Sequence, residues 1–151
     1  MHNNIQPAHP GKTVPLHLRL DVPAYAGPDA PTRANGIDYR YADFSGADLQ
    51  HADLRHADLR GASFRNADLS RADLHGADLR GADFSHATMV ATRLEWGNAQ
   101  HAEFFLAKME YSHCQFTDFS HSNLQAADLS NADCMFTCLA WANLTNTNLG
   151  L

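Results

Sequence analysis

The sequence predicts an all-β solenoid, a quadrilateral parallel β-helix of about six coils, and three features of the chain lead to this prediction. A five-residue unit repeats 23 times from residue 37 to residue 151 without an insertion. Within the unit, small, acidic and bulky residues keep the same positions. Central phenylalanines recur at every fourth unit, namely Phe44, Phe64, Phe84 and Phe104. A coil of four units would place these rings in one column.

The unit has one bulky position, and its neighbours differ from it in size and charge. The central residue is never charged, and only Ala99 is small there. The residue two places before the centre is Ala in 15 units, and the residue between them is Asp in 12 units and Asn in four. We therefore expect the small and central side chains to point inward. The Asp or Asn and the last two residues of each unit should point outward.

The five-residue period does not fit an α-helix or a flat strand. Five residues at about 100° each advance a helix by about 500°, so successive central residues would not share a face. In a strand, residues five apart point to opposite sides of the sheet. A chain that turns a corner after every unit fits the pattern, with successive coils paired at about 4.8 Å.

These repeats resemble the pentapeptide repeat family, whose pattern is A(D/N)LXX. Close matches are Ala47-Asp48-Leu49, Ala57-Asp58-Leu59 and Ala77-Asp78-Leu79. The resemblance covers residues 37–151 and implies a right-handed quadrilateral β-helix. The pattern loosens between residues 88 and 116, where Arg93, Lys108 and His113 replace Asp, and Ala99 and Cys114 replace Leu. We expect the coil to be distorted there.

The first 36 residues form a separate segment that contains all six prolines. Apolar and polar residues alternate in its middle, as in a half-buried strand; the apolar ones are Val14, Leu16, Leu18, Leu20 and Val22. The open end of a β-helix is normally covered. Residues 14–22 are therefore predicted to be a short N-terminal capping strand, and the alternative is an arm that adds a strand to another molecule.

The other end of the repeats finishes in register, with apolar side chains in the last coil. The residues concerned are Leu139, Leu144, Leu149 and Leu151. An uncovered end favours association, so we expect a symmetric homodimer through this coil. The alternative is an end that is tolerated in solution.

The outward residues change character along the chain, from polar in the first half to apolar in the second. The candidate interface residues are Trp96, Phe105, Leu106, Tyr111, Phe116, Met135, Phe136 and Trp141. With a coil of four units, Trp96, Phe116 and Phe136 fall in one outward column. Exposed aromatic side chains that lie together usually mark an interface. The alternative is that turns or the first 36 residues cover them.

Acidic residues should also form columns, because Asp38, Asp58, Asp78 and Asp118 lie whole coils apart, as do Asp48, Asp68 and Asp128. Some members of the family that these repeats resemble imitate duplex DNA and protect type II topoisomerases from quinolones or peptide toxins. The repeats carry 15 acidic and 8 basic residues, so basic side chains interrupt such a surface. The alternative is that the Asp side chains bond to the turn backbone.

The remaining features limit the function classes. One domain is expected, in a reducing cytoplasmic setting, because there are three cysteines, no apolar run of membrane-spanning length and no signal pattern. Cys114 and Cys134 should be neighbouring buried thiols, with a disulfide between them as the geometrically possible alternative, and Cys138 should point outward. His101 and His121 should stack at one corner, but no metal-ligand spacing is present. No catalytic motif, cofactor, membrane or direct nucleic-acid contact is indicated. The sequence thus favours a non-enzymatic protein-binding scaffold, with topoisomerase protection as the alternative.

Overall fold

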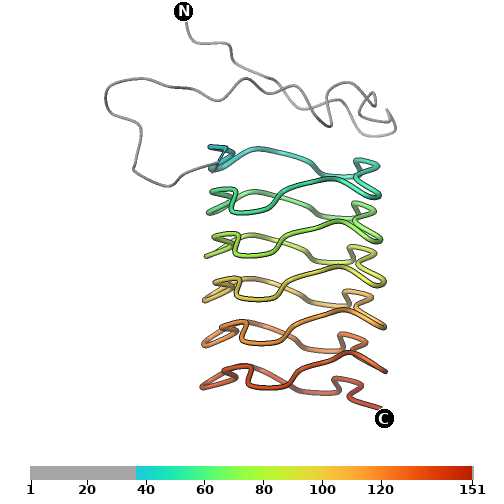
Figure 1. The fold of residues 1–151 in the computed structure, drawn as a ribbon. Helices are drawn as coiled ribbons and strands as arrows, with labels where there is room; N and C mark the ends of the chain where they lie inside the picture. The colour runs from blue at the N-terminus through green and yellow to red at the C-terminus, as the bar shows by residue number, and fades with distance from the viewer. Residues whose placement is uncertain (1–36, 151) are drawn as a thin grey trace, which may run out of the picture.

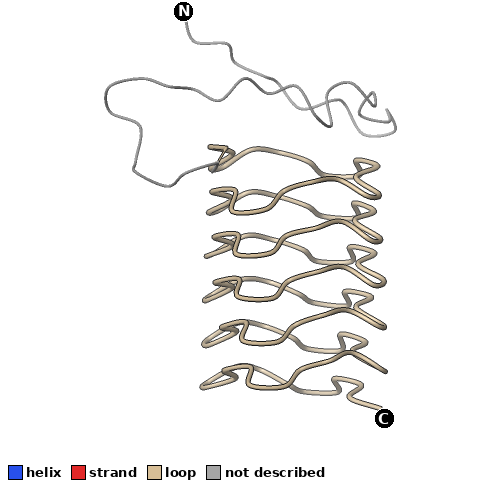
Figure 2. Ribbon diagram, in the orientation of Figure 1, coloured by secondary structure: helices blue, strands red, loops and turns tan. Residues whose placement is uncertain are grey.

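The computed structural model describes residues 37–150 as a stack of similar coils that follow one another along a single axis (Figure 1). Within this range the chain forms no helix and no strand longer than one bridged residue, so it is drawn as loop throughout (Figure 2). None of these residues therefore forms an apolar helix that could cross a membrane. The predicted capping strand 14–22 lies outside the described residues, and so does Leu151.

The coils are joined by single parallel bridges between residues that lie one coil apart. There are 19 such bridges, from Asp38–Asp58 to Asp128–Asn148, and each joins residues four units apart. Around each bridge the backbone hydrogen bonds run alternately from one coil to the next and back. The Tyr39 N–H donates to the Asp58 carbonyl at 2.8 Å, and the Asp58 N–H donates to the Ile37 carbonyl at 2.8 Å. The predicted coil of four units is therefore present in the described range.

A tight turn closes every unit and makes the corners. The N–H that follows each turn donates to the central carbonyl three residues earlier, as Ala42 does to Tyr39 at 3.1 Å. The last residue of each unit has a positive φ, at 18 non-glycine residues and at four glycines. A positive φ at the second central residue alone is the mark of a type II turn. Four such turns lie between two bridged residues and give the coil its four corners.

Asp and Asn in the second position of the unit support these turns. Their Oδ1 atom accepts the backbone N–H two residues later, for example from Ser45 to Asp43 at 2.9 Å and from Gln100 to Asn98 at 3.2 Å. Such Asx turns stabilise a backbone that a non-glycine residue otherwise adopts at a cost. The acidic position of the repeat therefore has a structural role. This agrees with the alternative in the sequence analysis that the Asp side chains bond to the turn backbone.

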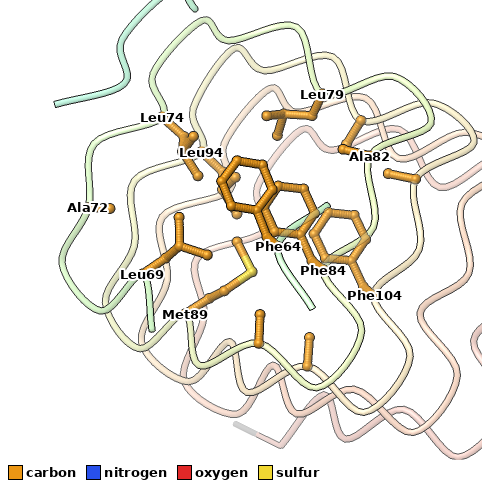
Figure 3. Packing of buried hydrophobic residues seen from close by; sticks show 14 of the residues in the cluster. Phe64, Leu69, Ala72, Leu74, Leu79, Ala82, Phe84, Met89, Leu94 and Phe104 are labelled. Atoms are coloured by element: carbon orange, nitrogen blue, oxygen red, sulfur yellow. The ribbon is translucent and has the colours of Figure 1, made fainter. Parts of the chain in front are cut away.

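The interior is filled by the small and central residues, as predicted (Figure 3). Phe64, Phe84 and Phe104 are fully buried. With the half-buried Phe44 they stack in one column, at centroid distances of 5.1, 4.7 and 5.0 Å along the chain. The predicted column of four rings is therefore confirmed.

The expected distortion between residues 88 and 116 is wrong. The bridges Thr88–Lys108 and Arg93–His113 continue the ladder, and every turn in this segment keeps its hydrogen bond. The Thr92 hydroxyl, which stands where most units have Ala, donates to the Leu69 carbonyl at 2.8 Å. The backbone ladder does not require Asp or Leu, so the replacements in this segment leave it intact.

Candidate functional site

The outward surface is built from four columns of turn residues, one at each corner. One corner carries Trp96, Phe116 and Phe136, which we call the aromatic column. Each has a positive φ of 59° to 61°, so the repeated turn aims all three side chains in the same way. The column therefore follows directly from a coil of four units.

The three rings stack face to face along the coil axis. The centroid distance is 4.2 Å from Trp96 to Phe116 and 5.0 Å from Phe116 to Phe136, with interplanar angles of 11° in both pairs. Trp96 is 61% exposed, Phe116 43% and Phe136 73%. Large aromatic groups that stay in water next to one another are unusual on a monomeric surface.

Polar atoms without partners lie beside this column. Glu95 and Gln115 directly precede Trp96 and Phe116, and their Oε2 and Oε1 atoms are buried with no hydrogen bond in the described part of the chain. The other Glu95 oxygen accepts from Arg93 at 3.2 Å, and the Gln115 amide donates to Asp133 at 2.6 Å. No sequence pattern points to these acceptors, because only the side-chain packing decides which oxygen stays unpaired.

The other predicted interface residues do not join the column. Met135 precedes Phe136 at the same corner and is 59% exposed. Phe105 is only partly exposed, because its ring packs edge-on against His86 at 5.5 Å. Leu106, Tyr111 and Trp141 each belong to a different one of the three remaining corners. The continuous aromatic surface expected from the sequence is therefore confined to one corner.

The acidic columns are present, but in one of them arginine side chains lie beside the Asp residues and pair with them. Arg40, Arg60 and Arg80 each form a two-pronged ion pair with the Asp two residues earlier, and the closer contact is 2.7 Å in all three pairs. The Arg60 guanidinium also reaches Asp78 in the next coil at 3.8 Å. This alternation of charge makes an Asp–Arg ladder along residues 38–80.

The ladder changes the acidity of its carboxyl groups. Hydrogen bonding from Arg40 lowers the pKa of Asp38 below its usual value. Burial works to raise the pKa of Asp78, but hydrogen bonds from Arg80 outweigh it, so that pKa is also lowered. These carboxyl groups therefore stay ionised and paired at neutral pH.

The last described coil has partly exposed apolar side chains, as the sequence predicted. Leu139 and Leu144 are half-buried, and Leu149 is 51% exposed. This coil thus presents partly exposed apolar side chains.

The cysteines and histidines also lie where their spacing placed them, with one difference. Cys114 is buried, but Cys134 is only half-buried, and both are free thiols. The His101 and His121 rings stack at 4.9 Å. Within residues 37–150 no three His, Cys, Asp or Glu side chains are arranged to hold a metal ion.

The repeats match the family model described as pentapeptide repeats, in 8 copies over residues 35–66, 42–81, 67–104 and 112–150. The chain is similar to a pentapeptide repeat protein from the thylakoid lumen of Arabidopsis thaliana, with 31% identity and a TM-score of 0.60 over 64% of this chain and 66% of that one. It also resembles a trypsin-treated variant of QnrB1, a plasmid-mediated fluoroquinolone resistance protein, with 18% identity and a TM-score of 0.50 over 73% of this chain and 59% of that one. The chain thus spans less than two thirds of the length of either protein. No curated protein matches the sequence.

Proposed function

Because the chain belongs to the pentapeptide repeat family, whose fold is a right-handed β-helix, we propose that it is a binding scaffold that holds another protein at its aromatic column. The observation that carries this proposal is the stack of Trp96, Phe116 and Phe136, which leaves three aromatic side chains between 43% and 73% exposed. Tryptophan and other large aromatic residues dominate the binding energy of protein interfaces. A partner that covers the column would remove this apolar surface from water.

The unpaired oxygens beside the column suggest what the partner offers. A buried acceptor without a donor destabilises the free protein, and a bound donor would remove that cost. Glu95 Oε2 and Gln115 Oε1 are two such acceptors among the described residues, and each side chain must turn outward before a donor of the partner can reach it. A partner surface that joins an apolar patch to N–H or O–H donors fits this corner best.

Binding suits the fold better than catalysis. The inward side chains of the coil pack against one another from Ala47 to Leu129. Variation between units therefore falls on the outward residues, which can change without loss of the core. A surface that varies on a constant frame is typical of solenoid binding proteins.

Capture of partners from the native host with paired variants tests the proposal. Trp96→Ser and Phe116→Ser remove the column, whereas Tyr111→Ser removes an aromatic residue that is 59% exposed at another corner. We expect a partner that binds the unchanged protein and Tyr111→Ser but is lost from both column variants. Equal capture by all four proteins, each shown to be folded by circular dichroism, would contradict the proposal.

Topoisomerase protection by DNA mimicry is the second candidate, and it rests on charge. Residues 94–150 contain six acidic side chains and one basic side chain. The Asp–Arg ladder counts against it, because a duplex mimic needs a continuous row of unpaired negative charge. A gyrase supercoiling assay with a quinolone decides between the candidates. Protection that survives Trp96→Ser would favour mimicry.

The end of the last described coil is proposed to pair with a second copy through Leu139, Leu144 and Leu149. A twofold axis would bring these apolar side chains of one copy against the same side chains of the other. The aromatic column would remain free for a different protein.

A further inference from the structure

Two of the three cysteines lie one coil apart in the same inward column. Cys114 and Cys134 are both central residues, and the Cys114 N–H donates to the carbonyl of Asp133, next to Cys134, at 2.8 Å. The parallel bridge between His113 and Asp133 fixes the two coils at this point. Adjacent coils are about 4.8 Å apart, which lies inside the Cα separation of about 4.4–6.8 Å that a disulfide needs.

The two thiols differ in their exposure, and this gives each a separate role. Cys114 is fully buried and its Sγ lies 3.3 Å from the Ser112 hydroxyl, whereas Cys134 is half-buried and is the more exposed of the two. The neighbouring Cys134 thiol and burial raise the pKa of Cys114, and the neighbouring Cys114 thiol lowers the pKa of Cys134. The accessible sulfur is therefore also the one that ionises first.

The position of this pair in the fold connects it to the surface. Each cysteine stands two residues before a member of the aromatic column, Cys114 before Phe116 and Cys134 before Phe136. Those two rings are 5.0 Å apart, compared with 4.2 Å for Trp96 and Phe116. A change in the spacing of the two sulfur atoms would be passed on to these rings through one short turn.

We propose that Cys114 and Cys134 form a peroxide-sensitive dithiol whose oxidation to a disulfide alters the ring stacking in the Phe116–Phe136 half of the aromatic column. The Cys134 thiolate attacks a hydroperoxide, which breaks the O–O bond, leaves a sulfenic acid on Cys134 and releases water or an alcohol once the leaving oxygen takes a proton. The Cys114 sulfur then attacks the Cys134 sulfur. The S–S bond forms, the S–OH bond breaks, and the hydroxide leaves as water with the Cys114 proton. A disulfide holds the Cβ atoms about 3.5–4.5 Å apart, so the stacked side chains of Cys114 and Cys134 must tilt or shift from their places in coils about 4.8 Å apart.

The disulfide would change the binding of a partner without altering any side chain on the surface. The geometry of the two coils would change at the corner that carries Phe116 and Phe136, and the stacking of their rings would change with it. This consequence for the column rests on the proposed binding function, but the chemistry of the dithiol does not. A failure of the binding proposal would therefore leave the oxidation result unchanged.

Cys138 is exposed and would complicate the measurement, so the test uses Cys138→Ser as background. Reduced, dilute protein is treated with hydrogen peroxide and then analysed by intact mass and by thiol titration after unfolding. We expect both thiols to be lost and to return on reduction with dithiothreitol, with a gain of 2 Da in that reduction step. Oxygen added to a methionine such as Met135, which is 59% exposed, stays in place during this reduction and does not affect the difference. The matched control, Cys114→Ala in the same background, should form no disulfide within the molecule and should instead gain oxygen at Cys134.

A second readout follows the column itself. In the Cys138→Ser, Trp141→Phe background Trp96 is the only tryptophan, and we expect its emission, excited selectively over that of tyrosine, to change on oxidation and to return on reduction. A gain of 16 or 32 Da with one thiol remaining, or a bridge that forms only between molecules, would overturn the dithiol. A disulfide within the molecule with unchanged Trp96 emission would overturn its coupling to the column.

Discussion

The indole of Trp96 lies on the ring of Phe116, with 4.2 Å between the centroids, although the two residues are four repeat units apart in the sequence. This contact exists because one coil takes four units and because both residues stand at the positive-φ position of their turns. The same rule stacks Phe64 on Phe84 inside the coil at 4.7 Å. One repeat length therefore sets both the core and the surface.

The buried phenylalanine column should be a main source of stability. Phe64 has neighbouring rings on both sides, at 5.1 and 4.7 Å, and is fully buried. We expect Phe64→Ala to reduce the free energy of unfolding by about 3–5 kcal/mol, because it leaves a cavity between two coils. Urea unfolding followed by circular dichroism measures this, and a change below about 1 kcal/mol would place the ring outside the core.

Hydroxyl groups in the inward column should differ in effect according to their partners. The buried Thr117 hydroxyl donates to the Leu94 carbonyl at 2.7 Å, whereas the buried Ser122 hydroxyl has no partner within residues 37–150. We expect Thr117→Val to destabilise the fold by about 1 kcal/mol and Ser122→Ala to leave it unchanged or more stable. Thermal unfolding of the two variants makes the comparison. The reverse order would show that the Thr117 contact does not support the coil.

The Asp–Arg ladder should make the free energy of unfolding depend on pH in the acidic range. The pKa values of Asp38 and Asp78, which belong to the ladder, are lowered in the fold, and so is that of Asp53, which pairs with Arg55 in another column. Their contribution is therefore complete above the unfolded value of about 3.9 and is lost as pH falls through the lower folded values. We expect the urea midpoint to be constant from pH 7 to pH 5 and to fall below pH 4.

Removal of one arginine serves as the matched experiment for the ladder. Arg60 is partly exposed and contacts both Asp58 and Asp78. Exposed ion pairs contribute little to stability, so Arg60→Gln should barely move the urea midpoint at neutral pH. The loss of stability in acid should become slightly smaller, because Arg60 is one of the charges that lower the pKa of Asp78. An unchanged acid profile would mean that other carboxyl groups cause the loss.

The regular features of this fold could be predicted from the sequence because each depends only on the repeat. The stack of Phe44, Phe64, Phe84 and Phe104 follows from the coil length, and so does the aromatic column. Features that depend on one side chain meeting another could not be predicted. Thr92, for instance, lies in the segment where the repeat pattern loosens. Its hydroxyl donates a hydrogen bond to the Leu69 carbonyl, 23 residues earlier in the chain.

The surface was harder to predict than the core for the same reason. Phe105 has the outward position expected from its place in the unit, but its ring turns onto His86 and is only partly exposed. Cys134 has an inward position, yet it stays half-buried because it belongs to the last described coil. Position in the repeat sets the direction of a side chain, and its neighbours decide how much of it meets water.

Association through the last described coil should depend on its apolar side chains. Leu144 is half-buried there. Leu144→Arg places a charge in the proposed contact and should convert a dimer into single copies while the earlier coils stay folded. Light scattering measures the mass and circular dichroism checks the fold. A single copy of the unchanged protein at high micromolar concentration would end the dimer proposal.

The central claim is that another protein contacts the aromatic column, and site-specific photo-crosslinking in the native host tests it most directly. Benzoylphenylalanine is introduced in place of Phe136 and, as the matched control, in place of Tyr111, which is also well exposed but lies at a different corner. We expect a discrete crosslinked protein from position 136 that is absent from position 111 and is reduced by a further Trp96→Ser change. No adduct at position 136, or the same adduct at both positions, would contradict the claim.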